Sequence, residues 1–219
     1  MRILVISPHA DDEVIGCGGT ILRSVAEGHS VDVVVVTVGN VNRRHEEVKS
    51  TKSTRLREFE AVAAELGLSN YSVLFEDYEN KLDMLPMLEI ISQLDSALDA
   101  GYDQVFFPYA SHHQDHRVMY EACFSALREG ARDNPPSLIA MYEYTYIGWA
   151  PASVPGGRYF VNITPYMERK KAILSLYSSQ LHSEPHPISI GSVETLARMR
   201  GMESGTQYAE MFYLLKMVV

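Results

Sequence analysis

Two short segments bring together side chains that can bind a metal ion. The first, SPHADDE at residues 7–13, places one imidazole and three carboxylates close together, namely His9, Asp11, Asp12 and Glu13. Neighbouring carboxylates repel each other and raise the pKa of at least one of them, and a divalent cation removes that conflict. The alternative interpretation is an acidic first turn of a helix, which the helix dipole favours. This segment alone leaves both interpretations open.

The second segment, HHQDH at residues 112–116, favours the metal. It holds three histidines and an aspartate, a set that is hard to explain by packing: His112, His113, Asp115 and His116. Two histidines and one carboxylate leave coordination positions open on zinc, which is typical of a catalytic rather than a structural site. Zinc held in this way lowers the pKa of a bound water to about 7, so hydroxide is available at neutral pH.

The elements that must position these segments alternate between strands and helices. Apolar and β-branched runs predict strands at 2–7, 31–39, 71–76, 103–109, 137–144 and 158–163, and helical spacing predicts helices at 14–28, 54–66, 84–98, 117–129, 165–177 and near 193–203. This alternation indicates a parallel, right-handed α/β sandwich. Ligands of open parallel sheets bind at the carboxyl ends of the strands, and both segments follow such ends. We therefore expect them on the same rim.

Composition narrows the class of protein. The 219 residues fit one domain, 1–219, and the formal net charge of −9 opposes a nucleic-acid partner. The two cysteines, Cys17 and Cys123, are most simply two separate thiols in a reducing cytosol. We expect no signal peptide and no membrane span, and hence a cytoplasmic protein. The apolar run MFYLLKMVV at 211–219 suits either an interface between copies of the chain or the end of the sheet.

The motifs resemble those of a known family. PHADDEVIGCGGTIL (8–22) is similar to the signature of the PIG-L/LmbE family of zinc-dependent N-deacetylases, and HQDH (113–116) is similar to its second motif, HPDH. Weaker matches follow in order along the chain: RLREFEAVAAELG (55–67), YSSQ (177–180), and RG (200–201) with GTQYAE (205–210). The resemblance implies a three-layer α/β/α, Rossmann-like (LmbE-like) sandwich around a mostly parallel sheet.

The resemblance also implies an activity and a metal site. The activity is hydrolysis of the N-acetyl group of an amino sugar or amino-sugar conjugate, with a small N-acetylated sugar as the partner and neither nucleic acid nor membrane. The implied zinc ligands are His9, Asp12 and His116, and such a set also accepts Fe²⁺. Asp11 is the implied general base, which takes a proton from the water at the metal.

Four further residues receive roles from the resemblance. His113 is implied as a cation or proton donor for the tetrahedral intermediate, and Asp115 as the residue that orients and charges it. Arg55 is implied to hold a polar group of the substrate, and Gln180 is a second candidate for the pocket wall. The chain has Gln at position 114 where the family motif has Pro, which leaves His112 open as an alternative to His113. The spacing to His116 favours His113.

Other functions fit the residues less well. Gly16, Gly18 and Gly19 do not match the G-x-G-x-x-G spacing of dinucleotide-binding proteins. A metal-dependent phosphoesterase would need a second metal, and a non-catalytic metal-binding module would need a closed set of four ligands. Trp149, in an aromatic segment, suits either stacking on a sugar ring or capping a loop.

Overall fold

A seven-stranded sheet runs through the computed structural model, which describes residues 1–40, 50–146 and 156–219. The strands are β1 (Arg2–Ser7), β2 (Ser30–Val38), β3 (Asn70–Glu76), β4 (Gln104–Pro108), β5 (Leu138–Tyr142), β6 (Gly157–Asn162) and β7 (Ala209–Met217). Their order in the sheet is β3-β2-β1-β4-β5-β7-β6. The first five are parallel, and β7 is antiparallel to both β5 and β6. The predicted mostly parallel sheet is confirmed.

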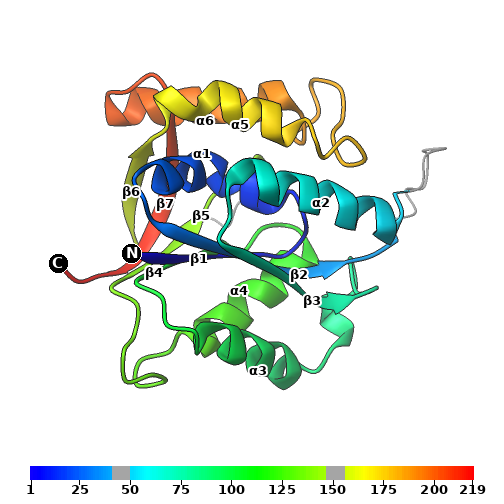
Figure 1. Cartoon of the computed structure of the whole chain (residues 1–219), viewed down its shortest axis with the longest axis vertical. Helices are drawn as coiled ribbons and strands as arrows, with labels where there is room; N and C mark the ends of the chain where they lie inside the picture. The colour runs from blue at the N-terminus through cyan, green and yellow to red at the C-terminus, as the bar shows by residue number, and fades with distance from the viewer. Residues whose placement is uncertain (41–49, 147–155) are drawn as a thin grey trace.

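Helices cover both faces of this sheet, as Figure 1 shows. The α-helices are α1 (Asp12–Ala26), α2 (Lys52–Leu66), α3 (Met87–Leu98), α4 (Gln114–Ala126), α5 (Met167–Leu174) and α6 (Ile190–Ser204), and the short 3-10 helices are η1 (Leu82–Met84) and η3 (Thr164–Tyr166). Helices α1, α2, α5 and α6 lie on one face, and α3 and α4 lie on the other. The fold is therefore the expected three-layer α/β/α sandwich.

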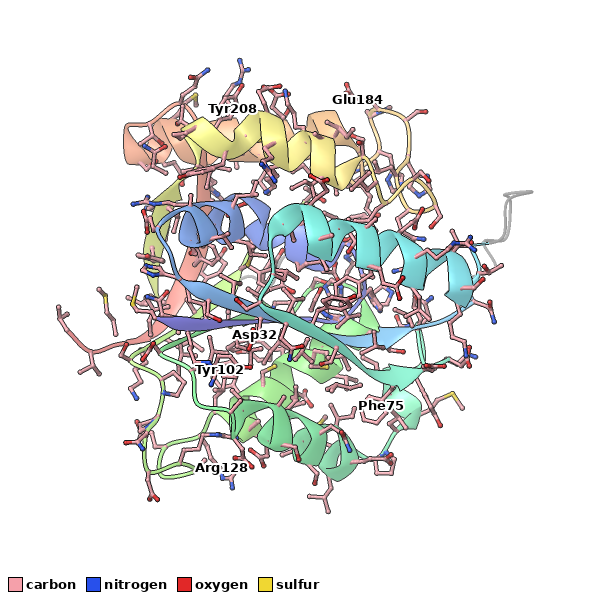
Figure 2. All side chains as sticks on the ribbon, viewed as in Figure 1. Asp32, Phe75, Tyr102, Arg128, Glu184 and Tyr208 are labelled. Carbon is pink, nitrogen blue, oxygen red and sulfur yellow. The ribbon has the colours of Figure 1, made fainter. Side chains whose placement is uncertain are left out.

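The central strands are mostly apolar because both of their faces are covered. In β2, every residue from 31 to 38 is buried, and in β1 every residue after Arg2 is buried. Continuous apolar runs of this kind are typical of strands in parallel sheets. The side chains between the sheet and the two helical layers fill the core (Figure 2).

Helix α1 approaches the sheet closely because two of its residues lack side chains. A Cβ atom on Gly16 would lie 2.2 Å from the ring of Tyr142 in β5, and one on Gly19 would lie 2.6 Å from the side chain of Ile163. The Tyr142 hydroxyl donates a hydrogen bond to the Ile6 carbonyl oxygen at 3.0 Å, which fixes its ring. The glycines thus allow close packing directly beneath the loop between β1 and α1.

Some helix boundaries differ from the prediction. Helix α4 begins at Gln114 rather than at 117, because the His113 side chain caps it by accepting a hydrogen bond from the Asp115 backbone N–H at 3.2 Å. Helix α3 begins only at Met87, after η1 and Pro86. The segment predicted as a helix at 165–177 consists of η3 followed by the short α5.

Several smaller predictions can also be compared with the structure. Cys17 and Cys123 are both buried and free, as expected. The apolar run at 211–219 contributes to β7 and so completes the sheet. None of the helices in the described ranges is long and apolar enough to cross a bilayer. Trp149 lies outside the described residues.

Candidate active site

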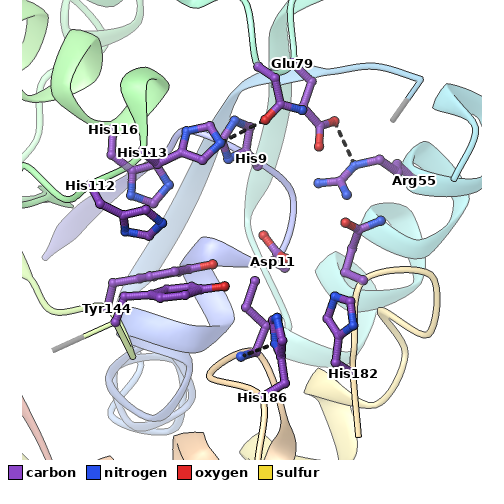
Figure 3. Close-up of a pocket in the computed structure, with 14 residues that line it drawn as sticks. His9, Asp11, Arg55, Glu79, His112, His113, His116, Tyr144, His182 and His186 are labelled. Atoms are coloured by element: carbon purple, nitrogen blue, oxygen red, sulfur yellow. Dashed lines mark hydrogen bonds and ion pairs between the residues drawn. The ribbon is translucent and has the colours of Figure 1, made fainter. Parts of the chain in front are cut away.

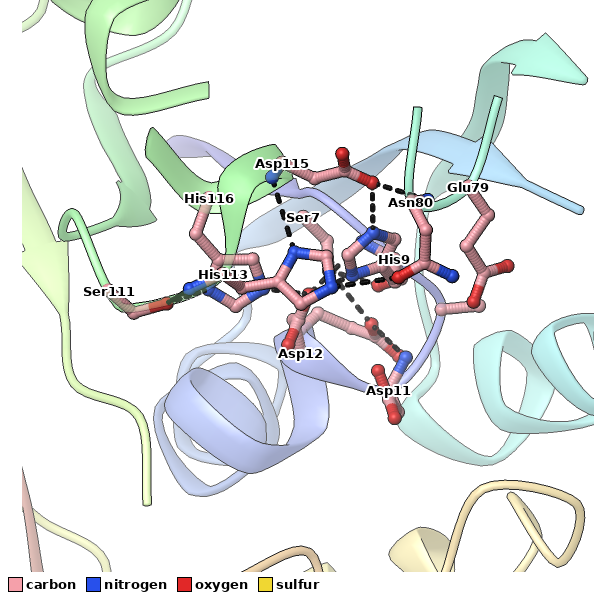
Figure 4. Close-up of polar contacts among 12 residues, drawn as sticks. Ser7, His9, Asp11, Asp12, Glu79, Asn80, Ser111, His113, Asp115 and His116 are labelled. Atoms are coloured by element: carbon pink, nitrogen blue, oxygen red, sulfur yellow. Dashed lines mark hydrogen bonds and ion pairs between the residues drawn. The ribbon is translucent and has the colours of Figure 1, made fainter. Parts of the chain in front are cut away.

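The candidate metal ligands meet where two adjacent strands end. Strands β1 and β4 are parallel neighbours, so the segments that follow them share one rim of the sheet. His9 lies in the loop after β1, Asp12 is the first residue of α1, and His116 lies in the first turn of α4. One potential ligand atom from each of the three lies within 4.8 Å of the others. Figure 4 shows this convergence.

The two imidazoles face the same oxygen atom of Asp12. His9 Nδ1 and His116 Nε2 each lie 3.3 Å from Asp12 Oδ2. The other ring nitrogen of each histidine is already held, because His9 Nε2 contacts Asp115 Oδ2 at 2.9 Å and His116 Nδ1 contacts Ser111 Oγ at 3.0 Å. These outer contacts orient the remaining nitrogens toward Asp12, as is usual for histidines that bind metals.

The electrostatics of this cluster favour a bound cation. Asp12 is fully buried, and its Oδ1 atom has no hydrogen-bond partner among the described residues. Burial alone would raise the pKa of Asp12, but His116 and His9 lower it well below its usual range. Burial alone would lower the pKa of His9, but hydrogen bonds to Asp115 and Asp12 raise it to about 10. Two imidazoles around a buried carboxylate with a vacant oxygen fit a divalent metal ion.

Asp11 has an unusual backbone conformation beside this cluster. Its φ of 146° and ψ of −30° are rarely adopted by residues other than glycine. Its backbone N–H donates to Glu13 Oε2 at 3.1 Å, and its side chain lines the adjoining pocket. Burial raises the pKa of Asp11, as does the charge of Asp12, while Arg55 opposes both effects. Strained residues of this kind concentrate at active sites.

The buried carboxylate of Glu13 connects the loop between β1 and α1 to Tyr177 through hydrogen bonds. Its carboxylate accepts hydrogen bonds from Asp11 N, from Ser7 Oγ at 3.2 Å and from the Tyr177 hydroxyl. The side chain is fully buried, and burial raises the pKa of Glu13 to about 7 although the Tyr177 hydrogen bond opposes this. From the sequence, Glu13 was only one member of an acidic cluster. Tyr177 is the first residue of the YSSQ segment, so this hydrogen bond connects that segment to the SPHADDE segment.

The environment of Asp115 differs from the sequence-based expectation. Its carboxylate accepts hydrogen bonds from His9, from Asn80 N at 2.7 Å and from Leu82 N at 3.1 Å. We expected this carboxylate to orient and charge His113. Its hydrogen bond goes to His9 instead, while its charge raises the pKa of His113 against the larger effect of burial. The backbone N–H of Asp115 donates to His113 Nδ1.

His113 is held as a neutral imidazole. Its Nδ1 accepts the Asp115 backbone N–H, so the proton is on Nε2, which donates to Asn80 Oδ1 at 2.8 Å. Burial and the charges of His9 and His116 lower the pKa of His113 to about 4. Of the two roles expected for His113, cation or proton donor, these contacts fit the second, because Nδ1 accepts the Asp115 N–H and Nε2 faces Asn80 Oδ1. His112 also reaches the pocket, and its ring lies 4.4 Å from that of Tyr146.

A pocket of about 300 Å³ opens above the ligand cluster. Figure 3 shows Asp11, Arg55, Glu79, His182 and His186 directed toward its interior. Arg55 and Gln180, the two expected substrate contacts, both line it. These lining residues received no individual role from the sequence: Glu79, Asn80, Tyr144 and Tyr146. The signal that could have found them is their position just after β3 and β5, at the same rim as the metal ligands.

Comparisons with known proteins identify the family to which the chain belongs. Residues 4–127 match the family described as GlcNAc-PI de-N-acetylase (PIG-L). Diacetylchitobiose deacetylase of Thermococcus kodakarensis is 27% identical over 95% of this chain and 81% of its own length. A probable N-acetyl-alpha-D-glucosaminyl L-malate deacetylase of Bacillus subtilis is 27% identical over 64% of this chain and 66% of its own. The solved N,N'-diacetylchitobiose deacetylase of Pyrococcus horikoshii superimposes with a TM-score of 0.74 at 27% identity, covering 98% of this chain and 83% of that one.

Proposed function

Because the chain belongs to the PIG-L family, described as GlcNAc-PI de-N-acetylase, we propose that it is a zinc-dependent hydrolase that removes the N-acetyl group from an amino sugar or amino-sugar conjugate. The observation that carries the proposal is the convergence of His9, Asp12 and His116, with one ligand atom of each within 4.8 Å of the others and a buried Asp12 Oδ1 that has no hydrogen-bond partner among the described residues. The named activities of the relatives, deacetylation of diacetylchitobiose and of an N-acetylglucosaminyl malate, support the substrate class.

Asp11 is the general base of the proposed reaction. A zinc ion held by His9, Asp12 and His116 would supply an activated water and polarise the amide carbonyl. Asp11 would accept a proton from the attacking water and would pass it to the nitrogen that leaves as the amine. Its place in the pocket beside the cluster, on a backbone fixed by Glu13, suits this transfer.

His113 and Asp115 support the reaction in different ways. The Nε2–H of His113 donates to the oxygen of the amide as that oxygen becomes negative, after it has exchanged its present acceptor, Asn80 Oδ1. Donors of this kind contribute about 3–4 kcal/mol in comparable acyl-transfer sites. Asp115 acts through the metal site, because its hydrogen bond to His9 Nε2 directs Nδ1 toward Asp12. Arg55 and Gln180 hold oxygen atoms of the sugar at the opposite wall.

Metal content and acetate release test the proposal together. The purified protein is expected to bind about one zinc ion per chain and to release acetate from N-acetylglucosamine or N,N'-diacetylchitobiose. A chelator should abolish acetate release, and added zinc should restore it, whereas added magnesium should not. Acetate release that is unaffected by complete metal removal would refute a metal-dependent mechanism.

The same measurement distinguishes the two-metal phosphoesterase. A second group of potential ligands consists of His9, His113 and Asp115. It shares His9 with the first group, and a hydrogen bond already joins His9 to Asp115, so it does not support an independent second ion. A content near two metals per chain, together with hydrolysis of phosphate esters, would favour the phosphoesterase instead.

A further inference from the structure

Arg55 is a buried cation in the wall of the active-site pocket. It is the one lysine or arginine among the described residues that line this pocket, and its side chain is only 1% exposed. One of its nitrogens, Nη2, donates to the Ala10 carbonyl oxygen at 3.1 Å. A guanidinium in such a place needs a negative partner, because an isolated buried charge is costly.

Glu79 is that partner, and the structure fixes it in place. Glu79 Oε2 lies 3.0 Å from Arg55 Nε, and the Gly39 backbone N–H donates to the same oxygen at 3.0 Å. A Cβ atom on Gly39 would lie 3.0 Å from the Glu79 Cβ, so glycine provides the room for this approach. Figure 3 shows the ion pair at the pocket wall.

A second carboxyl group, that of Asp11, lines the same pocket as Arg55 and Glu79. The ion pair with Glu79 is the contact that neutralises Arg55. The positive charge of Arg55 is already balanced before any substrate binds.

We propose that Glu79 makes the pocket selective for N-acetylated sugars that carry no phosphate or carboxylate near Arg55. The buried Nη1 of Arg55 has no hydrogen-bond partner among the described residues, so it requires an acceptor. A hydroxyl, ether or carbonyl oxygen meets that requirement without adding charge. An anionic group would bring a further negative charge beside Glu79, whose carboxylate already balances Arg55, and like charges placed together exclude a ligand.

This selectivity rests on the proposed deacetylase function but is not implied by the family. The names of the relatives include an uncharged disaccharide, diacetylchitobiose, and a conjugate of malate, which is an anion. Family membership therefore leaves the charge of the substrate open. The ion pair between Arg55 and Glu79 is the feature of this chain that decides it.

The test compares an uncharged sugar with its phosphorylated forms. The zinc-loaded enzyme is assayed with N-acetylglucosamine and with the same sugar phosphorylated at its anomeric carbon or at its primary hydroxyl. The wild-type kcat/KM is expected to be at least about tenfold higher for the uncharged sugar. Glu79→Gln keeps the shape of the side chain and an acceptor for Gly39 N–H. In this variant, the ratio of kcat/KM for the uncharged sugar to kcat/KM for the sugar whose phosphate lies near Arg55 should fall by about tenfold or drop below one.

Glu76→Gln is the matched control. It removes the same charge from a side chain that is 60% exposed and pairs with Lys52 outside the pocket. The control should leave the ratio of the kcat/KM values unchanged. The proposal is overturned if the wild-type enzyme uses a phosphorylated sugar as well as the uncharged one, or if Glu79→Gln and Glu76→Gln give the same ratio. If Glu79→Gln fails to fold, the wild-type enzyme still tests the proposal, because equal kcat/KM values for the uncharged and a phosphorylated sugar overturn it.

Calorimetric binding separates this proposal from the proposed function. If the zinc-loaded protein releases no acetate from any of the sugars, the deacetylase proposal fails, and binding of the intact sugars can then be measured directly. Selectivity is still supported if the uncharged sugar binds at least about tenfold more tightly than the phosphorylated ones. Equal binding of all the sugars, or binding of none, overturns it.

Discussion

The backbone of Asp11 adopts a conformation that its neighbours must hold in place. Val14 N and Ile15 N donate to the Asp11 carbonyl oxygen at 3.1 and 2.9 Å, and the Asp11 N–H donates to Glu13. The backbone N–H and the backbone carbonyl of Asp11 are thus both hydrogen-bonded to residues in the first turn of α1. A carboxylate aimed by a strained backbone is already oriented when the substrate arrives, which is how strain contributes to an active site.

At the residue scale, Asp11→Asn tests the assignment of the base. Asparagine has the same shape and tolerates positive φ, so the zinc content should equal that of the wild-type protein. The kcat is expected to fall by about 10²–10⁴-fold, because the amide cannot accept the proton. His116→Ala is the contrasting variant, and it should lose both zinc and acetate release. Wild-type turnover in Asp11→Asn would mean that another group takes the proton.

Glu13 gives a second prediction at this scale. In Glu13→Ala the Asp11 N–H loses its buried acceptor, which should lower the free energy of unfolding by about 1–3 kcal/mol. The kcat should fall at least about tenfold with little change in KM, because the base is misaligned. Glu13→Gln keeps one accepting oxygen for Asp11 N–H and should retain most of the activity. Urea unfolding and steady-state kinetics of both variants measure this, and equal losses would argue against a positioning role.

At the scale of elements, the approach of α1 to the sheet depends on Gly16. In Gly16→Ala the added methyl group meets the Tyr142 ring, which a hydrogen bond to Ile6 holds in place. Overpacking of this kind costs about 1–3 kcal/mol, and the better helix propensity of alanine offsets up to about 1 kcal/mol. We expect a net loss of stability in urea unfolding and reduced zinc binding.

Gly18→Ala is the control for this prediction. A Cβ atom on Gly18 would lie 3.1 Å from Val14 Cγ1 and 3.3 Å from Lys170 Cγ, which are side-chain atoms at a less severe distance than the Tyr142 ring is from Gly16. The free energy of unfolding should change by less than about 1 kcal/mol. A larger loss in Gly18→Ala than in Gly16→Ala would show that contact with Tyr142 does not limit the packing of α1.

The bounds of a helix or strand could be predicted from the sequence where one periodic pattern of apolar residues runs through the whole element. The strand at 2–7 was predicted with its observed bounds, because an unbroken apolar run has one interpretation in a parallel sheet. The start of α4 was not, because a histidine is an unusual cap and HHQDH looks like a polar loop. The place of β7 between β5 and β6 depends on long-range pairing, which local patterns do not contain.

The resemblance to the family implied the metal triad, whereas its surroundings could not be predicted. His9, Asp12 and His116 meet because the ends of β1 and β4 are adjacent, and the alternation of strands and helices had led us to expect the two segments on the same rim. The pairing of Asp115 with His9 could not be read from the sequence, because the two residues are far apart in the chain and the motif points to His113 instead. Glu79 has no motif of its own, so only its distance to Arg55 reveals it.

At the scale of the whole molecule, a buried ion pair ties α1 to the C-terminal half of the described fold. Lys170 Nζ lies 2.6 Å from Glu210 Oε1 and donates to the Ile15 carbonyl oxygen at 2.8 Å. Glu210 also accepts hydrogen bonds from the backbone of Gly19 at 2.8 Å and of Thr20 at 2.7 Å. The helix that carries Asp12 is therefore anchored to α5 and β7, and metal binding is coupled to the stability of the whole sandwich.

Zinc should consequently raise the melting temperature of the entire protein. A ligand that binds only the folded state at about 100 times its Kd contributes about 2.7 kcal/mol. For a chain of this size, that corresponds to an increase in Tm of roughly 5–10 °C. Calorimetric melting with zinc and with a chelator measures the difference. His116→Ala should show no such increase, and an equal increase in that variant would place the stabilising ion elsewhere.

The position of β7 has a consequence for how the chain folds as it is synthesised. Strand β6 has its hydrogen-bonding neighbour in β7, which follows α5 and α6 in the sequence, and β5 gains its second neighbour from the same strand. Until the ribosome has released β7, the edge of β5 is open and β6 has no strand beside it in the sheet. Glu210, whose carboxylate pairs with Lys170 and receives the N–H groups of α1, also arrives with β7. The nascent chain thus makes its candidate metal-binding motifs before the strand that secures them, so the edge of β5 needs shielding until β7 has been synthesised.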